Sequence, residues 1–546
     1  MKNIFLQQAL AQIPNILSRL DTNPHSPTYG CFDLNFWHHK ITDFPTGTAI
    51  ECVWPLALAY DTNSPENPYY QQPALRQWIE AGIFYAAKSA HPDFSCDNYF
   101  PYDRDSKTTA FSLLACIETC VLLELDNPEI IKFFEKRADW LSNHTQNTQN
   151  PEILAAIILC LELLSQLFKT SKWKRTKATT LENLLQSQNQ EGWFPENSKC
   201  NPGSHTLILS YLARLYQIKP DIKLRESLIK ATEFASQLMY PDGSFAGDMG
   251  INKDYFFPHG FELIGRWFPD ALRINDNFLQ AISTGIFSLF WDERNTPLYV
   301  GNYLLAGRDF VSDRPTSTFR PTGRFWFQQA QILIDRRNFT NSGSFLSETA
   351  LTLPSQRPSA TTELYVSLSQ GGVFKLYRNR QLIASDTHFS VLINQNNKVI
   401  NFAAYLATPT VIEVKENEII IQGQLQCVEQ QTLTPKKIIL QRLIALSIGR
   451  LFPKFLSKIQ PKNNHKNSNF RFSRRLGWET GRLLVIDELE FDDWENILAV
   501  GIGSSLTSPN SQLKRIQPSL LQPWIDLTNT AKKLSPGEIL KLERRL

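Results

Sequence analysis

The 546-residue sequence lacks several features that mark familiar classes of site. It contains eight cysteines but no Cys-x-x-Cys pair, so a structural zinc site has little support. No Gly-rich phosphate-binding motif occurs, which argues against a nucleotide cofactor. No apolar run reaches the length of a membrane span, and segment 1–21 lacks the features of a cleaved signal peptide. We therefore expect a cytoplasmic protein without a cofactor.

An excess of charge of one sign is also absent. The chain has 56 Lys and Arg residues against 53 Asp and Glu residues, for a net charge of +3. This balance argues against nucleic acid as a partner. With 42% hydrophobic and 20% charged residues, the composition excludes a mostly disordered chain, a coiled coil and a collagen-like fibre. The length allows about two to four domains, and aromatic residues are plentiful at 12%.

Apolar residues recur at three- and four-residue steps through much of the first half of the chain, which predicts helices. Prolines stand at the starts of several of these segments, where a missing N–H is harmless. The predicted helices cover 107–125, 128–145, 151–168, 173–188, 203–217 and 222–239.

A weak internal repeat accompanies the helices. Gly192 is followed by Trp193 and Phe194, and Gly243 is followed two residues later by Phe245; the glycines are 51 residues apart. That period suits a helical hairpin as the repeating unit. Stacked hairpins extend as a solenoid or close into an (α/α) toroid, and the Gly-then-aromatic turn favours the toroid.

From about residue 362 the pattern changes to short alternating segments bounded by Gly, Asn and Asp, which predicts an antiparallel β-sandwich. We therefore expect an α+β multidomain chain, with an (α/α) toroid over 1–350 and a sandwich over 351–546. Segment 288–361 is expected to link them through a loop and at least one helix.

A basic segment interrupts the predicted sandwich. Between Glu429 and Glu479 there are eleven Lys and Arg residues and no acidic residue, which predicts an insertion at about 436–475. Its bases suit an anionic membrane surface or an acidic polysaccharide. A solvated loop that protects a sheet edge is the structural alternative. The segment leaves open a peripheral membrane location and a scaffold role without catalysis.

Three clusters of polar and aromatic residues stand at helix ends, over 96–105, 192–205 and 242–260. In a toroid, loops at one end of alternate helices converge on one mouth. Aromatic rings stack on sugars, and Asn, His, Arg and carboxylates bind hydroxyl and acid groups. The clusters therefore favour a carbohydrate site over a nucleotide site.

Three stretches carry a resemblance to a known family: NYFPYDR, EGWFPEN…PGSHTLILSYLARLY and PDGSFAGD…YFFPHGFEL. They resemble heparinase II/III-like and alginate-lyase-like polysaccharide lyases, in particular the branch associated with bacterial exopolysaccharides. The resemblance implies β-elimination at a uronic acid of an acidic polysaccharide, without an obligatory metal.

The resemblance also implies roles for individual residues. Asn98 and Arg104 would neutralise the substrate carboxylate. His205 and His259 would act as base or orienting groups, and Tyr255 or Tyr102 as base and acid. The expected substrate-binding residues are Arg104, Tyr99, Trp193, Glu196 and Asp248. Each residue also has a structural interpretation, as a turn, cap, ion pair or packed ring.

One element departs from the family. Its His-x-Asp pattern at the first sandwich strands is absent from Ser385-Asp386-Thr387-His388. Two alternatives therefore stay open: a binding protein without catalysis, and a glycoside hydrolase on the same toroid. A hydrolase needs two carboxylates across the scissile bond. The candidates are Glu196, Asp242, Asp248 and Asp103.

Overall fold

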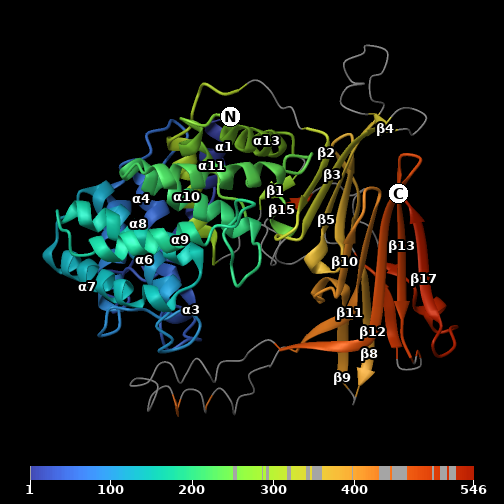
Figure 1. Ribbon diagram of the computed structural model, residues 1–546. Helices are drawn as coiled ribbons and strands as arrows, with labels where there is room; N and C mark the ends of the chain where they lie inside the picture. The colour runs from blue at the N-terminus through green and yellow to red at the C-terminus, as the bar shows by residue number, and fades with distance from the viewer. Residues whose placement is uncertain are drawn as a thin grey trace.

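The computed structural model (Figure 1) describes a helical part and a β part that lie side by side. The described residues are 2–249, 255–285, 287–289, 294–315, 321–339, 345–346, 360–395, 398–429, 439, 443–444, 464–492, 494, 497–503, 513–515 and 524–546.

Within the described residues, six inner helices form a closed ring, because each packs on the next and the last packs back on the first. The inner helices are α4 (Val53–Asp61), α6 (Ser106–Leu123), α8 (Pro151–Leu167), α10 (Pro202–Ile218), α12 (His259–Gly265) and α14 (Thr296–Arg308). Each is backed by an outer helix: α5 (Pro73–Lys88), α7 (Pro128–His144), α9 (Lys174–Gln186), α11 (Ile222–Gln237), α13 (Asp270–Ser283) and α1 (Lys2–Leu10). The predicted (α/α) toroid is confirmed.

The six helices predicted from periodicity agree with α6 to α11 to within two residues at each end. Local signals fix their starts. The Asp105 carboxylate accepts a hydrogen bond from the Thr108 backbone at 2.6 Å, and the Asn150 side chain caps α8 just before Pro151. Such caps satisfy N–H groups that have no partner within the helix. By length and composition, α6 is the one described helix that could cross a bilayer, and 78% of it is buried in the ring.

The predicted repeat is a turn that packs on an outer helix. Gly192 and Gly243 have φ angles of +101° and +86°, in the region that favours glycine. A Cβ atom at Gly192 would overlap the Lys230 backbone of α11, and one at Gly243 would overlap the Asn277 backbone of α13. Gly30 has a φ angle of +90°, and a Cβ atom there would overlap the Ala81 backbone of α5. It is therefore a third copy of this turn, which was not predicted from the sequence.

Replacing Gly192 by Ala is expected to lower the free energy of unfolding by about 1–3 kcal/mol or more, since both φ strain and a backbone overlap oppose the new side chain. Gly537→Ala is the matched control, because Gly537 has φ +84° but no atom near the added Cβ. Urea denaturation should show a clearly larger loss for Gly192→Ala. Equal losses of stability in Gly192→Ala and Gly537→Ala would mean that the close packing of Gly192 on α11 does not contribute to the effect.

Among the described residues, two large antiparallel sheets form the β part, as predicted for a sandwich, and a separate two-stranded sheet pairs β1 (Phe287–Leu289) with β15 (Leu513–Arg515). One has the order β2-β3-β5-β6-β7, with β4 beside β3, and the other β16-β14-β8-β9-β11-β12-β13-β17, with β10 beside β11. The first contains β2 (Gly323–Phe327), β3 (Ile332–Phe339), β4 (Phe345–Leu346), β5 (Ala360–Ser367), β6 (Val373–Arg378) and β7 (Gln381–Asp386). The second contains β8 (Phe389–Gln395), β9 (Lys398–Ala403), β10 (Val411–Val414), β11 (Glu418–Glu429), β12 (Asn464–Glu479), β13 (Arg482–Glu490), β14 (Ile497–Ile502), β16 (Ile525–Asp526) and β17 (Ile539–Arg545).

The link between the two parts differs from the prediction. The last ring helix ends at Arg308, and β2 and β3 follow from Gly323, so the helix expected after the linking loop is wrong. Both strands precede residue 350, the predicted domain boundary, and β3 pairs directly with β5. The predicted insertion at 436–475 lies largely outside the described residues, and its last part, 464–475, belongs to β12.

A fully buried arginine joins the two sheets. Arg474 of β12 contacts the Asp487 carboxylate of β13 at 2.6 Å and the Asp386 carboxylate of β7 at 2.8 Å. Arg544 of β17 reaches both carboxylates as well. His388 lies in the same cluster, with no exposed surface and its Nε2 atom 3.2 Å from Asp487. His388 is therefore part of the sandwich interior.

Candidate functional site at the mouth of the ring

The inner helices bring their first turns together at one end of the ring, which we call the mouth. Side chains in or before the first turns of different inner helices contact one another there. The contacts are Thr48 with Thr108 at 3.4 Å, Lys107 with Glu152 at 2.7 Å, Asn150 with Glu196 at 3.2 Å, and Arg294 with Asn98 at 2.8 Å. The three loops singled out in the sequence all lead into inner helices, so their ends share this side of the ring.

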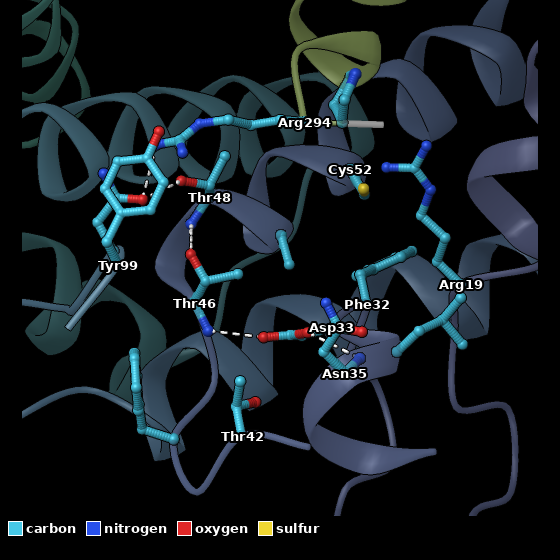
Figure 2. A pocket seen from close by; sticks show the side chains of 15 residues that line it. Arg19, Phe32, Asp33, Asn35, Thr42, Thr46, Thr48, Cys52, Tyr99 and Arg294 are labelled. Carbon is cyan, nitrogen blue, oxygen red and sulfur yellow. Dashed lines mark hydrogen bonds between the residues drawn. The ribbon is translucent and has the colours of Figure 1, made fainter. Parts of the chain in front are cut away.

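A cavity of about 320 Å³ opens at the mouth (Figure 2). Arg19 and Arg294 both line it, together with the rings of Phe32, Phe44 and Tyr99. We call it the mouth cavity. It combines two guanidinium groups with aromatic surface, a lining that suits an anionic ring-shaped ligand.

Among the described residues that line the cavity, Asp33 is the one carboxylate, and it is already engaged. The Asp33 Oδ1 atom accepts hydrogen bonds from the backbones of Asn35 and Phe36, and its Oδ2 atom accepts one from Thr46 at 2.9 Å. Figure 2 shows Asp33 beside Asn35 and Thr46. The described lining therefore combines two arginines with a carboxylate that already accepts three hydrogen bonds.

Asn98, Tyr99 and Arg294 form one wall of the cavity. The Arg294 guanidinium donates to the Asn98 Oδ1 atom at 2.8 Å and lies 3.9 Å from the centre of the Tyr99 ring. Thr48 donates to the same Oδ1 atom at 3.4 Å. Because both contacts end on the Oδ1 atom, the Nδ2 group of Asn98 is the part of the side chain that can donate to a ligand. Tyr99 is 66% exposed, so its ring is available to a ligand.

Tyr255 contacts the residue after Arg294. The Asn295 Nδ2 atom donates to the Tyr255 hydroxyl at 3.2 Å, and the Tyr255 ring packs edge-on against Tyr299 of α14. Of the predicted site residues, Asn98 and Tyr99 therefore contact Arg294 itself, and Tyr255 contacts its neighbour Asn295.

Carboxylates and a lysine line the mouth beside this wall. Lys107 pairs with Glu152, while the Glu196 carboxylate accepts hydrogen bonds from Asn150 and from Asn201 at 2.6 Å. Burial alone would lower the pKa of Lys107, but Glu152 and its neighbours raise it. Glu51 is different: burial raises its pKa to about 8, although Lys107 and Arg294 oppose the shift.

The raised Glu51 pKa predicts a pH-dependent stability. The folded state keeps a proton that the unfolded chain releases above about pH 4.5, so stability falls as pH rises towards about 8. The loss is at most about 1.4 kcal/mol per pH unit. Urea denaturation across this range should show the decline in the wild type but not in Glu51→Gln. Parallel profiles for the two proteins would contradict a protonated Glu51.

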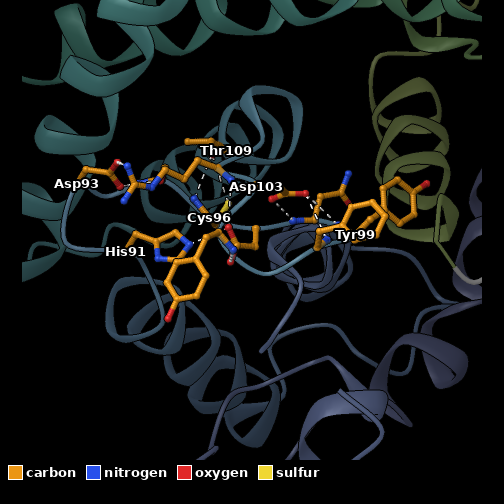
Figure 3. Close-up of polar contacts among 12 residues, drawn as sticks. His91, Asp93, Cys96, Tyr99, Asp103 and Thr109 are labelled. Carbon is orange, nitrogen blue, oxygen red and sulfur yellow. Dashed lines mark hydrogen bonds and ion pairs between the residues drawn. The ribbon is translucent and has the colours of Figure 1, made fainter. Parts of the chain in front are cut away.

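Tyr102 and Arg104 lie in the loop that leads into α6. Figure 3 shows polar contacts of this loop, with His91, Asp93 and Asp103 labelled. The Tyr102 ring stacks on His91, which pairs with Asp97 at 2.7 Å. The Arg104 guanidinium pairs with Asp93 at 3.3 Å. These contacts shape the loop that presents Asn98 and Tyr99.

The two predicted histidines are buried away from the mouth cavity. His205 is 1% exposed and its Nε2 atom contacts the Ala231 carbonyl of α11 at 2.9 Å, between the inner and outer rings. His259 is 2% exposed and its Nε2 atom contacts Asp309, just after α14 ends, at 2.8 Å. Burial lowers the pKa of each to about 4, which makes both weak bases at neutral pH.

The depth of His259 has a simple cause. Segment 255–258 runs beside the first half of α10, where the Phe257 backbone donates to Thr206 at 3.1 Å. α12 therefore starts halfway down the ring, with Gly260 packed against the Ser210 backbone. From there the His259 side chain reaches the end opposite the mouth.

Trp193 and Asp248 belong to the contact between the ring and the sandwich. Trp193 is 3% exposed and donates to Glu191, whose carboxylate also accepts a backbone hydrogen bond from Ala330. Asp248 pairs with Lys375 of β6 and accepts from the Tyr240 hydroxyl at 2.7 Å. These two residues hold loops of the mouth against the sandwich.

Sequence reasoning missed several residues of the mouth: Arg19, Glu51, Lys107, Glu152 and Arg294. A usable signal existed for four of them, because a charged side chain in or just before the first turn of an otherwise apolar helix is unusual. Arg19 carries no such signal, and only ring closure brings it beside Arg294. Among the described residues, no group of His, Cys, Asp and Glu could hold a metal ion.

Neither a protein-family model nor a curated protein sequence matches the chain. Similar solved structures include the chondroitin AC lyase of Streptomyces coelicolor A3, solved with chondroitin sulphate, at 9% identity and a TM-score of 0.49, over 91% of this chain and 67% of the lyase. A heparinase III has 9% identity and a TM-score of 0.37, over 91% and 71%. A β-arabinofuranosidase has 9% identity and a TM-score of 0.36, over 78% and 87%.

Proposed function

We propose that the protein is carbohydrate-active: it binds an acidic, uronic-acid-containing polysaccharide in the mouth cavity and cleaves it by β-elimination. The observation that carries this proposal is the placement of Arg294. It lines the cavity, hydrogen-bonds Asn98 and covers Tyr99, while Arg19 lines the same cavity. A uronate offers a carboxylate for the guanidinium group and a sugar ring for the aromatic surface.

The reaction needs a carboxylate that is neutralised before a proton leaves. The C5–H bond of a uronate is only weakly acidic until hydrogen bonds stabilise the charge that builds up on the neighbouring carboxylate. Arg294 and the Asn98 amide are the donors that we assign to this role. They lie on one wall, so both can reach a single carboxylate.

We assign proton abstraction at C5 to Tyr255. Its hydroxyl accepts a hydrogen bond from Asn295, the neighbour of Arg294, and this contact supports the assignment. Tyr99, Glu196 and the hydrogen-bonded loop that carries Tyr102 and Arg104 then form the surrounding saccharide surface. The catalytic roles first assigned to His205 and His259 remain predictions from the resemblance alone.

Replacing Tyr255 by Phe is expected to slow elimination by at least about 100-fold, the usual scale for losing a proton-transfer group. The assay follows the near-ultraviolet absorbance of unsaturated uronate products. Tyr216→Phe is the matched control, since Tyr216 lies in the last turn of α10, away from the mouth, and packs on Trp267. Wild-type rates for Tyr255→Phe would remove Tyr255 from the mechanism.

Hydrolysis is the alternative that the mouth carboxylates favour, because Glu51 holds a proton while Glu152 is paired with Lys107. Of the carboxylates first considered, Asp103 and Asp242 instead accept hydrogen bonds within their own turns. Cleavage in ¹⁸O-labelled water separates the two reactions. Elimination gives unsaturated products without solvent oxygen, whereas hydrolysis adds one labelled oxygen per cleaved bond.

Binding without turnover would leave a scaffold role in exopolysaccharide production. The membrane contact proposed for 436–475 rests mostly on residues outside the described ones, so it stays a prediction, as does a cytoplasmic location. Co-sedimentation with anionic vesicles, lost when 442–463 is deleted, together with no turnover on any uronan, would favour the scaffold.

A further inference from the structure

One titratable group at the mouth has no role in the reaction as assigned so far. Glu51 lies in the 3-10 turn η1 (Gly47–Cys52) that leads into α4, and it is 7% exposed. Thr48 and Cys52 of the same turn line the mouth cavity. Glu51 itself lines a second cavity, of about 40 Å³, on the ring axis. Pro297 borders both cavities, so the two adjoin there, and Glu51 lies between turn residues that line the mouth cavity.

The Glu51 carboxyl group is buried without a fixed partner. Among the described residues, no hydrogen bond or ion pair engages it, although its oxygens are not sealed from the cavity. The charged groups that act on it are Lys107 of α6, Arg294 before α14, Glu152 of α8 and Asp105 before α6. Glu118 of α6 and Arg214 of α10, which pair with each other, line the same small cavity. An uncommitted carboxyl group that is aimed into a cavity is free to exchange a proton with a ligand.

The neighbouring carboxylates lack this freedom. Glu152 is held by the Lys107 ammonium group, and Glu196 accepts from the Asn150 and Asn201 amides. Each of these partners is a donor, so Glu152 and Glu196 are held as acceptors. Glu51 alone combines burial with an unengaged carboxyl group in this part of the described mouth.

We propose that Glu51 is the general acid of the mouth and gives its proton to the leaving sugar oxygen. This assignment rests on the proposed β-elimination. In that step the C5 proton passes to the base and its electron pair forms the C4=C5 double bond. The C4–O bond breaks, and the leaving oxygen takes the Glu51 proton.

Two features support the assignment. The carboxylate left on Glu51 forms between Lys107 and Arg294, which stabilise it until water returns the proton. Burial also raises the pKa of Glu51 to about 8, so the proton is present at neutral pH. A group with the ordinary pKa of a glutamic acid would already be ionised.

The test compares two uronates that differ only in the leaving group at C4: a sugar, which needs a proton, and a nitrophenoxy group, which leaves without one. Glu51→Gln is expected to eliminate the sugar at least about 100-fold more slowly, yet to stay within about fivefold of wild type on the nitrophenoxy substrate. The wild-type rate on the sugar substrate should also fall above about pH 8, and Glu51→Gln should lack this fall.

Each other outcome decides against the assignment. An equal loss on both substrates would make Glu51 a structural residue, and no loss on either would remove it from the reaction. If Glu51→Gln misfolds, Glu51→Asp replaces it and must show the same leaving-group dependence. A wild-type protein that eliminates neither substrate would refute the proposed function and the assignment together, whereas an active wild type with an equally active Glu51→Gln would refute the assignment alone.

Discussion

Replacing Arg474 by Met is expected to lower the free energy of unfolding by about 3–5 kcal/mol, the range for breaking a buried ion pair from one side. The Arg474 side chain has no exposed surface and contacts Asp386 and Asp487 on the two facing sheets. Without it, Arg544 is left as the arginine of this cluster that contacts both buried carboxylates. Methionine fills part of the volume but supplies no donor.

The pKa of Asp487 also indicates that the contact with Arg474 stabilises the folded state. Burial alone would raise it, but Arg474 and His388 hold it well below its usual range. The folded state therefore depends on the ionised carboxylate, and its stabilising contribution is lost only in strong acid. In Arg474→Met the remaining charge on Asp487 becomes a cost at neutral pH.

Arg471→Met provides the control for this measurement. Arg471 lies on the same strand, but it is exposed and pairs with Glu490 at 2.7 Å on the sheet surface. Exposed pairs contribute little, so urea denaturation should not separate this variant from wild type. A small effect of Arg474→Met, comparable with that of Arg471→Met, would mean that the buried cluster is not what joins the sheets.

Replacing Arg294 by Gln is expected to lower kcat/KM on an acidic polysaccharide by about 100- to 1,000-fold, the usual loss for one donor that stabilises developing charge. Arg294 donates to Asn98, lies over Tyr99 and lines the mouth cavity. Glutamine keeps a hydrogen-bond donor but removes the charge and the second arm of the guanidinium group. Asn98 would then neutralise the substrate carboxylate alone.

Arg266→Gln tests whether any arginine of the ring would give the same result. Arg266 is exposed at the opposite end, where it pairs with Asp309 beside His259. We expect activity to remain at the wild-type level in this variant. Full activity of Arg294→Gln with loss in Arg266→Gln would move the site to the far end of the ring and restore His259 as a candidate.

Much of the ring could be predicted from sequence because its signals are local. Periodic apolar residues, prolines at helix starts and capping residues such as Asn150 depend on a few neighbouring positions. Ring closure is not local: α1 packs on α14 from nearly 300 residues away. Strands β2 and β3 were missed because the polar run around Gln329 hides their alternation.

The site could be predicted only in part for a related reason. Asn98, Tyr99 and Tyr255 were found because they stand beside helix starts, and a toroid collects helix starts at one end. His205 and His259 also stand beside helix starts, yet both side chains are buried. His205 is buried because its side chain points to α11, where it contacts the Ala231 carbonyl. His259 is buried because segment 255–258 runs beside the first half of α10, so that α12 begins about halfway down the ring. No spacing in the sequence indicates either feature.

A crystal structure of Tyr255→Phe with a bound uronate oligosaccharide would test the central claim most directly, because this variant is expected to bind without rapid cleavage. We predict a sugar carboxylate within hydrogen-bond distance of the Arg294 guanidinium group and the Asn98 Nδ2 atom, with a sugar ring against Tyr99. An oligosaccharide bound beside Arg266 at the far end of the ring, or on the sandwich with the mouth cavity unfilled, would contradict it.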